Sequence, residues 1–405
     1  MVTATTLHDT IDELMPGLIA DRRYLHENPE LGCEEFITSA FVIDRLTALG
    51  VEDIRTGINV TGVTGLIHGA KPSEGESRVL LVRADMDALP IHEENDVEYR
   101  SKVDGKMHAC GHDAHTAILL GLARVLIDRR DQFSGTVKLL FQPSEERGPG
   151  GARMMIEEGV LEDPHVDACF ALHMAQDEPL GTIIINEGPM LAASDRFSID
   201  IQGKGGHAAH PNLTVDPVVV GAHLITAIQA IVSRNVDPIE PAVVTIGSLH
   251  AGHAANVIPD TATLVGTVRT LNPDIQELIV RRLEEVANGV CESMGATAHF
   301  EYTYGVPATI NAPEAAALIR EAAIEMVGEE RVIAPPPSMG GEDFSYFTRE
   351  RPGAMFMVGS ANQEKGLIWG HHHPRFDIDE ESLGIGLETM AVAVVKYLAR
   401  GFGDR

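Results

Sequence analysis

The chain has 405 residues, a length that predicts two domains because a single hydrophobic core usually stops growing below that size. Apolar residues make up 44% of the chain and charged residues 22%, which is ordinary for a globular protein and argues against intrinsic disorder. The 60 acidic and 31 basic residues give a formal net charge of −29, which disfavours nucleic acid and anionic membranes as partners.

Targeting signals are not evident from the amino-acid pattern. The first 32 residues are interrupted by acidic side chains and lack a basic segment followed by an apolar one, so no secretory signal is predicted. The most apolar window, residues 217 to 232, has only 16 residues and contains polar side chains, which is too short and too polar to span a bilayer. The four cysteines form no CxxC pair and suit a reducing compartment. We therefore expect a cytoplasmic protein without a membrane partner.

Helix and strand patterns alternate over residues 35 to 172. The strands are almost continuously apolar, which is typical of a sheet covered on both faces and built mostly from parallel strands. The expected elements are a helix at about 35 to 49, a strand at 78 to 84, a helix at 115 to 130, a strand at 136 to 141, a helix near 150 to 159 and a strand at 167 to 173.

The order of elements then changes. A β-α-β-β-α-β series predicts a ferredoxin-like α+β unit, which is self-sufficient as two layers. Its expected elements are a strand at 196 to 203, a helix at 215 to 233, strands at 242 to 250 and 261 to 269, a helix at 273 to 291 and a strand at 297 to 304. A helix at 313 to 327, a strand at 354 to 359 and a helix at 380 to 400 resume the α/β alternation.

The simplest architecture is a discontinuous α/β domain with an inserted smaller domain. The predicted boundaries assign residues 1–190 and 306–405 to a catalytic domain with a mostly parallel sheet, and residues 191–305 to the inserted ferredoxin-like domain.

Residue types that bind metals or transfer protons follow the predicted strands of the first domain. Ligands of open α/β sheets bind outside the carboxyl ends of the strands, so these side chains are expected to meet at one edge. They are Asp85 and Asp87 in "RADMDALP", Cys110 and His112 in "HACGHDAH", Glu145 and Glu146 in "QPSEERGPGG", His173 at the end of "DACFALH", and His371, His372 and His373 in "GHHHPRFDIDEE".

Three interpretations compete for this edge. A two-metal hydrolytic site uses all of these side chains, because carboxylates, imidazoles and a thiolate suit divalent ions that acidify a water molecule. A Cys110 nucleophile with His112 or His115 as its base leaves the two glutamates and His173 without a role. A plain helix N-terminus capped by Asp113 requires five coincidences at one sheet edge. The two-metal site is therefore favoured.

Three residues of the inserted segment carry weaker signals. On the residues alone, His207 in "GGHAAHP" is typical of a turn, Asn256 in "NVIPD" of a hairpin, and Arg269 of a solvated charge at a strand end.

The motifs together resemble one protein family. "RRYLHENPELGCEE", "RADMDALP", "HACGHDAHTA", "QPSEERGPGGARMMIEEG", "GGHAAHP", "NVIPD", "GGEDFSYF" and "HHPRFDIDEE" occur in this order over nearly the whole chain. They resemble the dinuclear-metal amidohydrolases of the aminoacylase/carboxypeptidase family, in the branch of hippurate hydrolase, indoleacetyl-amino-acid hydrolases and N-acetyl-diaminopimelate deacetylase.

The resemblance implies a role for each matching residue. Glu145 corresponds to the general base and acid, and Asp87 to a residue that supports a metal ligand. In the family the last ligand lies two residues before a proline, which selects His372, although His371 replaces the usual leucine. The metal ligands are expected to be Cys110, His112, Glu146, His173 and His372, and the cofactor two divalent ions of Mn, Zn, Co or Ni.

The resemblance also implies a homodimer formed through the inserted domain. There, His207 matches a histidine that enters the partner's active site and polarises the scissile carbonyl. Asn256 and Arg269 match positions that can bind the carboxylate of the substrate.

The expected activity is hydrolysis of the amide bond of an N-acyl amino acid, such as a hippurate-, N-acetyl- or indoleacetyl-amino acid, by a metal-bound hydroxide. A metallo-dipeptidase or carboxypeptidase of the same family is the alternative, because the acyl pocket cannot be placed from the motifs. A catalytically silent scaffold protein is disfavoured, since neither a ligand nor the base is missing from the motifs.

Overall fold

The computed structural model describes residues 4–72, 77–147 and 150–403, which form two compact units. Unit 1 consists of Met1–Gly188, Ile310–Pro336 and Asp343–Arg405, and unit 2 of Pro189–Thr309 and Pro337–Glu342. The short segment at 337–342 therefore packs with unit 2, whereas the boundaries expected from the sequence place it in the discontinuous domain.

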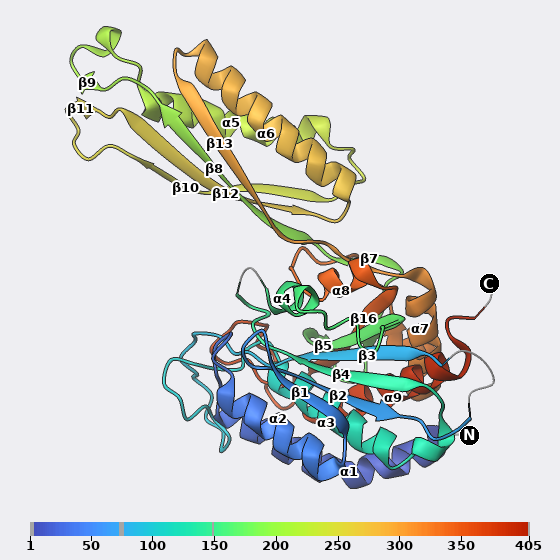
Figure 1. Cartoon of the computed structure of the whole chain (residues 1–405). Coiled ribbons are helices and arrows are strands. Elements are labelled where there is room, and N and C mark those ends of the chain that lie inside the picture. The colour runs from blue at the N-terminus through green and yellow to red at the C-terminus, as the bar shows by residue number, and fades with distance from the viewer. Residues whose placement is uncertain (1–3, 73–76, 148–149, 404–405) are drawn as a thin grey trace. The chain divides into compact units, whose positions relative to one another are not determined.

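Unit 1 contains an eight-stranded sheet in the order β1-β2-β4-β3-β5-β16-β6-β15 (Figure 1). The four central strands β4, β3, β5 and β16 are parallel to one another, as expected for the α/β class. An antiparallel hairpin, β1–β2, extends one side and was not expected from the sequence. The strands are β1 Glu52–Ile58, β2 Gly62–His68, β3 Val79–Asp85, β4 Thr136–Gln142, β5 Ala168–Pro179, β6 Ile183–Ile184, β15 Val332–Ile333 and β16 Gly353–Ala361.

Helices cover both faces of this sheet. Helices α1, α2, α3 and α9 lie on one face, and the short helices α4 and α8 lie on the other (Figure 1). Every residue of β4 is buried, because its apolar run contacts helices on both sides. The helices are α1 Ala4–Glu27, α2 Phe36–Leu49, α3 His112–Ile127, α4 Gly151–Glu157, α7 Pro313–Val327, α8 Ser345–Glu350 and α9 Glu381–Arg400, with 3-10 turns at Arg130–Gln132 and Glu329–Arg331.

Unit 2 has the β-α-β-β-α-β order that the sequence predicts. Its antiparallel sheet has the order β10-β12-β8-β13, and α5 and α6 pack together on the sheet around Ile199, Leu224 and Leu283. The main elements are β8 Ala193–Gln202, α5 Pro217–Asn235, β10 Ala242–Ala251, β12 Thr261–Thr270, α6 Pro273–Ser293 and β13 Thr297–Val306. Smaller elements of unit 2 are β9 Gly206–His207, β11 Val257–Ile258 and a 3-10 turn at Pro211–Leu213. Strands β7 Gly188–Leu191 and β14 Thr309–Asn311 lie where the chain passes from one unit to the other.

Helix α5 is longer than the apolar window in the sequence, which ends at residue 232. It begins at Pro217 behind the N-cap Asp216, whose carboxylate accepts a hydrogen bond from the Val218 amide. By length and composition alone, α5 and α9 could each cross a membrane, so the length argument from the 16-residue window does not hold. Both helices are also explained by packing: α9 is largely buried in unit 1, and one side of α5 packs on the unit 2 sheet.

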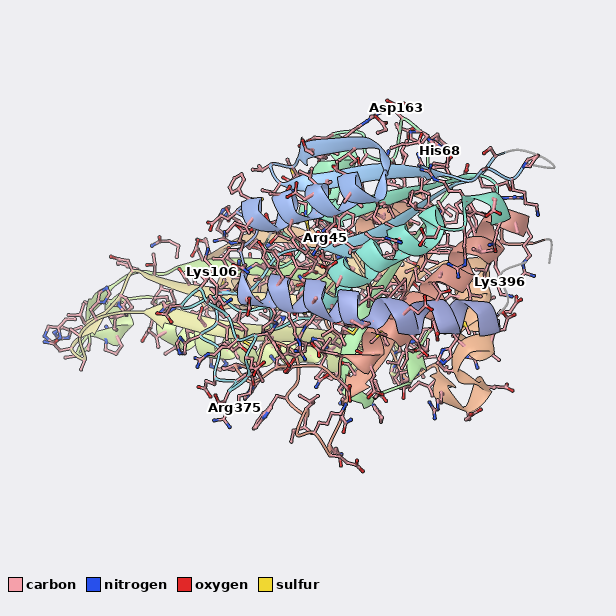
Figure 2. All side chains as sticks on the ribbon, turned by 90° about the horizontal axis from the view of Figure 1, so that it is seen from below. Arg45, His68, Lys106, Asp163, Arg375 and Lys396 are labelled. Atoms are coloured by element: carbon pink, nitrogen blue, oxygen red, sulfur yellow. The ribbon has the colours of Figure 1, made fainter. Side chains whose placement is uncertain are left out.

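Many basic side chains on the surface of unit 1 are paired with acids, so the excess negative charge comes from the remaining carboxylates. Such exposed ion pairs contribute little to stability, roughly 0 to 1 kcal/mol each. Figure 2 labels five members of these pairs, which are Arg45 with Asp21, Lys106 with Glu34, Arg375 with Glu94, Lys396 with Glu321 and Glu325, and Asp163 with Arg55.

Candidate metal centre

The parallel strands of unit 1 bring the expected ligands to one edge of the sheet. Ligand atoms of Cys110, His112 and His173 all lie within 4.8 Å of one another, and so do those of Cys110, Glu146 and His372. The two groups share the Cys110 sulfur. All five predicted ligands therefore belong to one cluster in which Cys110 can serve two adjacent ions.

The hydrogen bonds of two candidate ligands, His112 and His173, fix the orientation of their rings. His112 Nδ1 lies 2.8 Å from the Asp87 carbonyl oxygen, and His173 Nδ1 lies 2.7 Å from the Met174 carbonyl oxygen. An Nδ1–H that donates to a carbonyl leaves Nε2 as the coordinating atom, a common arrangement around protein-bound metals. Among the described residues, the buried His112 Nε2 has no hydrogen-bond partner. The His173 Nε2 lies 3.6 Å from Cys110 Sγ.

The three consecutive histidines have different surroundings. His372 Nε2 lies 3.0 Å from Glu146 Oε1, and its backbone has a φ of 64°, an uncommon value for a residue with a side chain. His373 instead stacks on Trp369 at 4.3 Å, and His371 packs beside the ring of His173. The geometry thus favours His372 as the ligand of this run.

Asp87 holds the two glutamates in place. Its Oδ1 accepts a hydrogen bond from the Glu145 amide and its Oδ2 one from the Glu146 amide, both at 3.0 Å. The preceding residue, Ser144, has a φ of 59°, and its amide donates to the buried carboxyl of Glu35 at 2.9 Å. This bent backbone presents two consecutive carboxylates at the edge of the sheet. One of them, Glu146, is the candidate metal ligand, and the other, Glu145, is the candidate base.

His115 and Asp85 also approach the cluster, but their hydrogen bonds give them a supporting position. The Met174 amide donates to His115 Nε2 at 2.9 Å, and His115 Nδ1–H donates to Asp85 Oδ1 at 2.6 Å. Both ring nitrogens are thus occupied within the protein. Asp85 also accepts a hydrogen bond from the buried Arg83 guanidinium at 2.7 Å. These contacts link α3 to β5 directly beside His173.

The electrostatics of the cluster favour a bound cation. Burial raises the pKa of the Cys110 thiol well above its ordinary value, and the nearby glutamates add to this effect. Burial lowers the pKa of His112, but Asp85 and the bond to Asp87 outweigh it and raise that pKa strongly. The negative groups that hold a proton here also favour a divalent ion in its place. A reactive Cys110 thiolate without a metal is disfavoured by the same burial.

Unit 2 separates its three predicted residues. The exposed His207 lies in β9 opposite Val257 of β11, and the Ala208 amide donates to the Asn256 carbonyl oxygen at 3.1 Å. Figure 1 shows β9 and β11 at one end of the unit 2 sheet. Arg269 lies near the other end of β12, about 27 Å from its start at ~3.4 Å per residue. Within one unit 2, His207 and Asn256 are neighbours and Arg269 is not.

Sequence reasoning missed several buried charged residues around the cluster. Arg83 binds Asp85 and the carboxylate of Asp343, which also accepts hydrogen bonds from Gln142 and the Ala152 amide. Arg22 similarly binds three acids inside unit 1. A charge within an apolar strand, as in "RVLLVRAD", signals such a partner, because an unpaired buried charge is costly.

Comparisons with known proteins identify a family and several relatives of this chain. Residues 81–396 match the family described as Peptidase family M20/M25/M40. The chain is 41% identical over 373 residues to N-acetyl-L-cysteine deacetylase of Bacillus subtilis, covering 92% of this chain and 86% of that protein. It is 38% identical over 395 residues to thermostable carboxypeptidase 2 of Saccharolobus solfataricus, covering 96% and 98%. A crystal structure of a dinuclear metal binding peptidase from Bacillus subtilis superposes with a TM-score of 0.84 at 35% identity, covering 96% and 99%.

Proposed function

The chain belongs to Peptidase family M20/M25/M40, and from that premise we propose that it is a metal-dependent amidohydrolase acting on N-acyl amino acids. The observation that carries the proposal is the double cluster around Cys110. Two groups of ligand atoms share the Cys110 sulfur, and one of them contains Glu146, which directly follows Glu145 in the chain.

We propose two divalent ions of Mn, Zn, Co or Ni as the cofactor, held by Cys110, His112, Glu146, His173 and His372. Bound there, they would activate water and polarise the amide carbonyl as Lewis acids. Glu145 is the residue that takes the proton from the attacking water and delivers it to the leaving nitrogen, because Asp87 fixes its backbone next to the ligand Glu146. Asp87 acts twice, since its carbonyl oxygen also orients His112.

The substrate class is proposed from the relatives together with the site. A deacetylase of an N-acetyl amino acid is 41% identical to this chain. The same hydrolysis of an N-benzoyl or N-indoleacetyl amino acid would yield benzoic or indoleacetic acid and the free amino acid. The substrate is therefore a small molecule with a free carboxylate next to the cleaved amide. Asn256 and Arg269 are the proposed donors to that carboxylate. Because they lie far apart within one unit 2, they would come from different protomers, with Asn256 entering the partner's site beside His207. The low total of basic residues in this chain makes such specific donors necessary.

We propose that the enzyme works as a homodimer through unit 2. Strand β10 lies at an edge of the unit 2 sheet, with Val243 and Leu249 about one third exposed, and α5 exposes Val218 and Val219. A second copy would cover these apolar side chains. His207 of one protomer would then stabilise the developing oxyanion in the partner's site, which explains why it lies far from Arg269 within its own chain. The proposed location is the cytoplasm.

Cleavage of dipeptides is the second candidate, because the chain is 38% identical to a carboxypeptidase over almost its full length. A dipeptide differs from an N-acyl amino acid by a free amine on the acyl side, which would require an additional carboxylate in the acyl pocket.

One assay tests both candidates. The protein, loaded with Mn²⁺ or stripped by a chelator, is incubated with a pool of N-acetyl, N-benzoyl and indoleacetyl amino acids and, separately, with alanyl dipeptides. Free amino acids are measured by mass spectrometry. We expect metal-dependent release from the N-acyl pool. Release from dipeptides alone would favour the carboxypeptidase, and release that survives stripping would move the chemistry to Cys110.

A further inference from the structure

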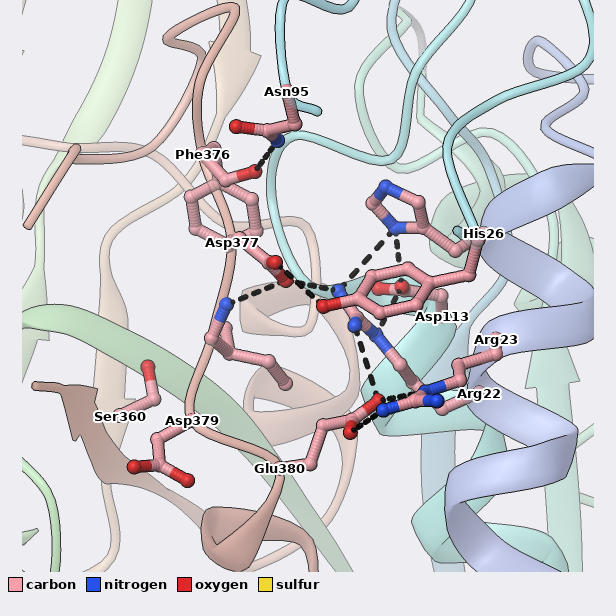
Figure 3. A network of polar contacts seen from close by, with 12 residues as sticks. Arg22, Arg23, His26, Asn95, Asp113, Ser360, Phe376, Asp377, Asp379 and Glu380 are labelled. Carbon is pink, nitrogen blue, oxygen red and sulfur yellow. Dashed lines mark hydrogen bonds and ion pairs between the residues drawn. The ribbon is translucent and has the colours of Figure 1, made fainter. Parts of the chain in front are cut away.

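The N-terminal motif "RRYLHE" places a completely buried arginine, Arg22, inside unit 1. Arg22 lies on α1, yet its side chain is 0% exposed and its guanidinium is directed toward α3 and the C-terminal loop (Figure 3). None of the roles assigned above to the metal cluster uses this residue.

Arg22 bridges the two segments that carry metal ligands from different parts of the chain. Its Nε donates to Asp113 Oδ2 at 2.8 Å, and its Nη2 donates to Asp377 Oδ1 at 2.8 Å. Asp113 directly follows His112 on the first turn of α3, and Asp377 follows His372 by five residues. One rigid planar group thus fixes the spacing between the backbone next to His112 and the loop that carries His372.

Neighbouring side chains complete this network. His26 lies 2.8 Å from Asp113 and 3.2 Å from Glu93, and Tyr99 donates its hydroxyl to Asp377 Oδ2 at 2.7 Å. Burial and the charge of Arg22 lower the pKa of His26, but its bonds to Asp113 and Glu93 raise it to about 9. The carboxylates of Asp113 and Asp377 are therefore each bound by a second side chain besides Arg22.

We propose that Arg22 is a positioning residue for the metal centre, which sets the relative placement of His112 and His372 through Asp113 and Asp377. The inference rests on the ligand set of the proposed function. Residues behind metal ligands typically change metal affinity by about 10- to 100-fold when they are replaced. A lysine at this position keeps the charge but cannot bind both carboxylates in the fixed geometry of a guanidinium.

Arg23 provides a matched control on the same helix. It forms a two-pronged ion pair with Glu380, is partly exposed, and has no recorded hydrogen bond to Asp113 or Asp377 among the described residues. Arg23→Lys therefore alters the ion pair with Glu380, which Arg22 also approaches at 3.4 Å. It leaves the bonds of Arg22 to Asp113 and Asp377 in place.

The experiment measures Co²⁺ binding to the full-length, metal-stripped protein without substrate. For Arg22→Lys we expect the Co²⁺ dissociation constant to rise about 10- to 100-fold, with altered visible absorption of the bound Co²⁺. For Arg23→Lys we expect a change within about twofold, as for a partly exposed ion pair. Circular dichroism and thermal unfolding of the metal-free proteins report whether both variants fold.

A second variant keeps the test decisive if Arg22→Lys does not fold. Tyr99→Phe removes one hydrogen bond to Asp377 without removing a charge, and we expect Co²⁺ binding to weaken by about fivefold, the effect of one hydrogen bond. If Arg22→Lys and Tyr99→Phe, as far as they fold, bind Co²⁺ with the affinity and visible absorption of the wild type, the proposal is overturned. Because no substrate is present, a protein that hydrolyses nothing but still loses Co²⁺ in Arg22→Lys would refute the proposed function and leave this inference standing.

Discussion

The two units place their candidate functional residues in opposite environments. In unit 1, buried charges such as Arg22 and Arg83 lie around the candidate ligands, and hydrogen bonds within the chain orient several of these ligands. In unit 2, His207 and Asn256 are exposed at the short antiparallel pairing of β9 with β11. The difference teaches that a buried site carries its geometry within the chain, whereas an exposed histidine acquires a defined geometry only when a second surface meets it.

The largest effect is expected for Glu145→Gln. A glutamine keeps the size of the side chain but cannot accept the proton, so turnover of an N-acyl amino acid should fall by about 10³- to 10⁴-fold. Metal content, measured by elemental analysis, should stay at the wild-type value because Glu145 is not a proposed ligand. Loss of metal together with activity would instead place Glu145 among the ligands.

His207→Ala should lower turnover by about 10²-fold, the typical effect of removing one oxyanion donor. Metal content and thermal stability should not change, because the side chain is exposed in unit 2. Mixing this variant with Glu145→Gln sharpens the comparison. If His207 acts in the partner's site, hybrid dimers contain one site with both residues and activity returns. Two inactive proteins that stay inactive after subunit exchange would place His207 outside the partner's site.

Glu35→Gln should change how stability depends on pH. Burial raises the pKa of Glu35 from its ordinary 4.5 to about 7, so the folded protein binds this proton more tightly than the unfolded chain. Its stabilising contribution is present below pH 4.5 and is lost as the pH rises through 7, by on the order of 2 kcal/mol. The variant should therefore lose less stability than the wild type between pH 5 and pH 8 in thermal unfolding. Parallel pH profiles of the two proteins would contradict the raised pKa.

The smallest effect is expected at the start of α5. Asp216→Ala removes the N-cap bond to Val218 and should destabilise this helix by about 1 kcal/mol. Hydrogen exchange should speed up in peptides of α5 and remain unchanged in peptides of α9. Faster exchange in α9 as well would mean that the two units unfold together.

The helices and strands whose apolar residues form a regular pattern could be predicted from the sequence. The buried strand β3 and the β-α-β-β-α-β order of unit 2 are such parts. The hairpin β1–β2 was missed because β1 is largely exposed and its sequence, "EDIRTGI", does not alternate. Helix α1 was missed as well, and it contains Pro16 within its span.

The ligand types of the candidate site were visible in the sequence because they follow consecutive parallel strands. The supporting contacts were not, since they join residues far apart in the chain, such as Arg22 with Asp377 and Glu35 with Ser144. A sequence shows that a charge is present, but burial and partner choice depend on the packing of all the elements around it.

The left-handed backbone at Ser144 and His372 has a consequence for engineering this protein. Such a conformation costs a residue with a side chain on the order of 1 kcal/mol, and glycine would relieve that cost. Glycine at position 372 would delete the imidazole, and glycine at position 144 would loosen the bend that presents Glu145 and Glu146. A screen for heat resistance alone would therefore favour glycine at these two positions, at the cost of the active centre. The library for such a screen should keep Ser144 and His372 fixed.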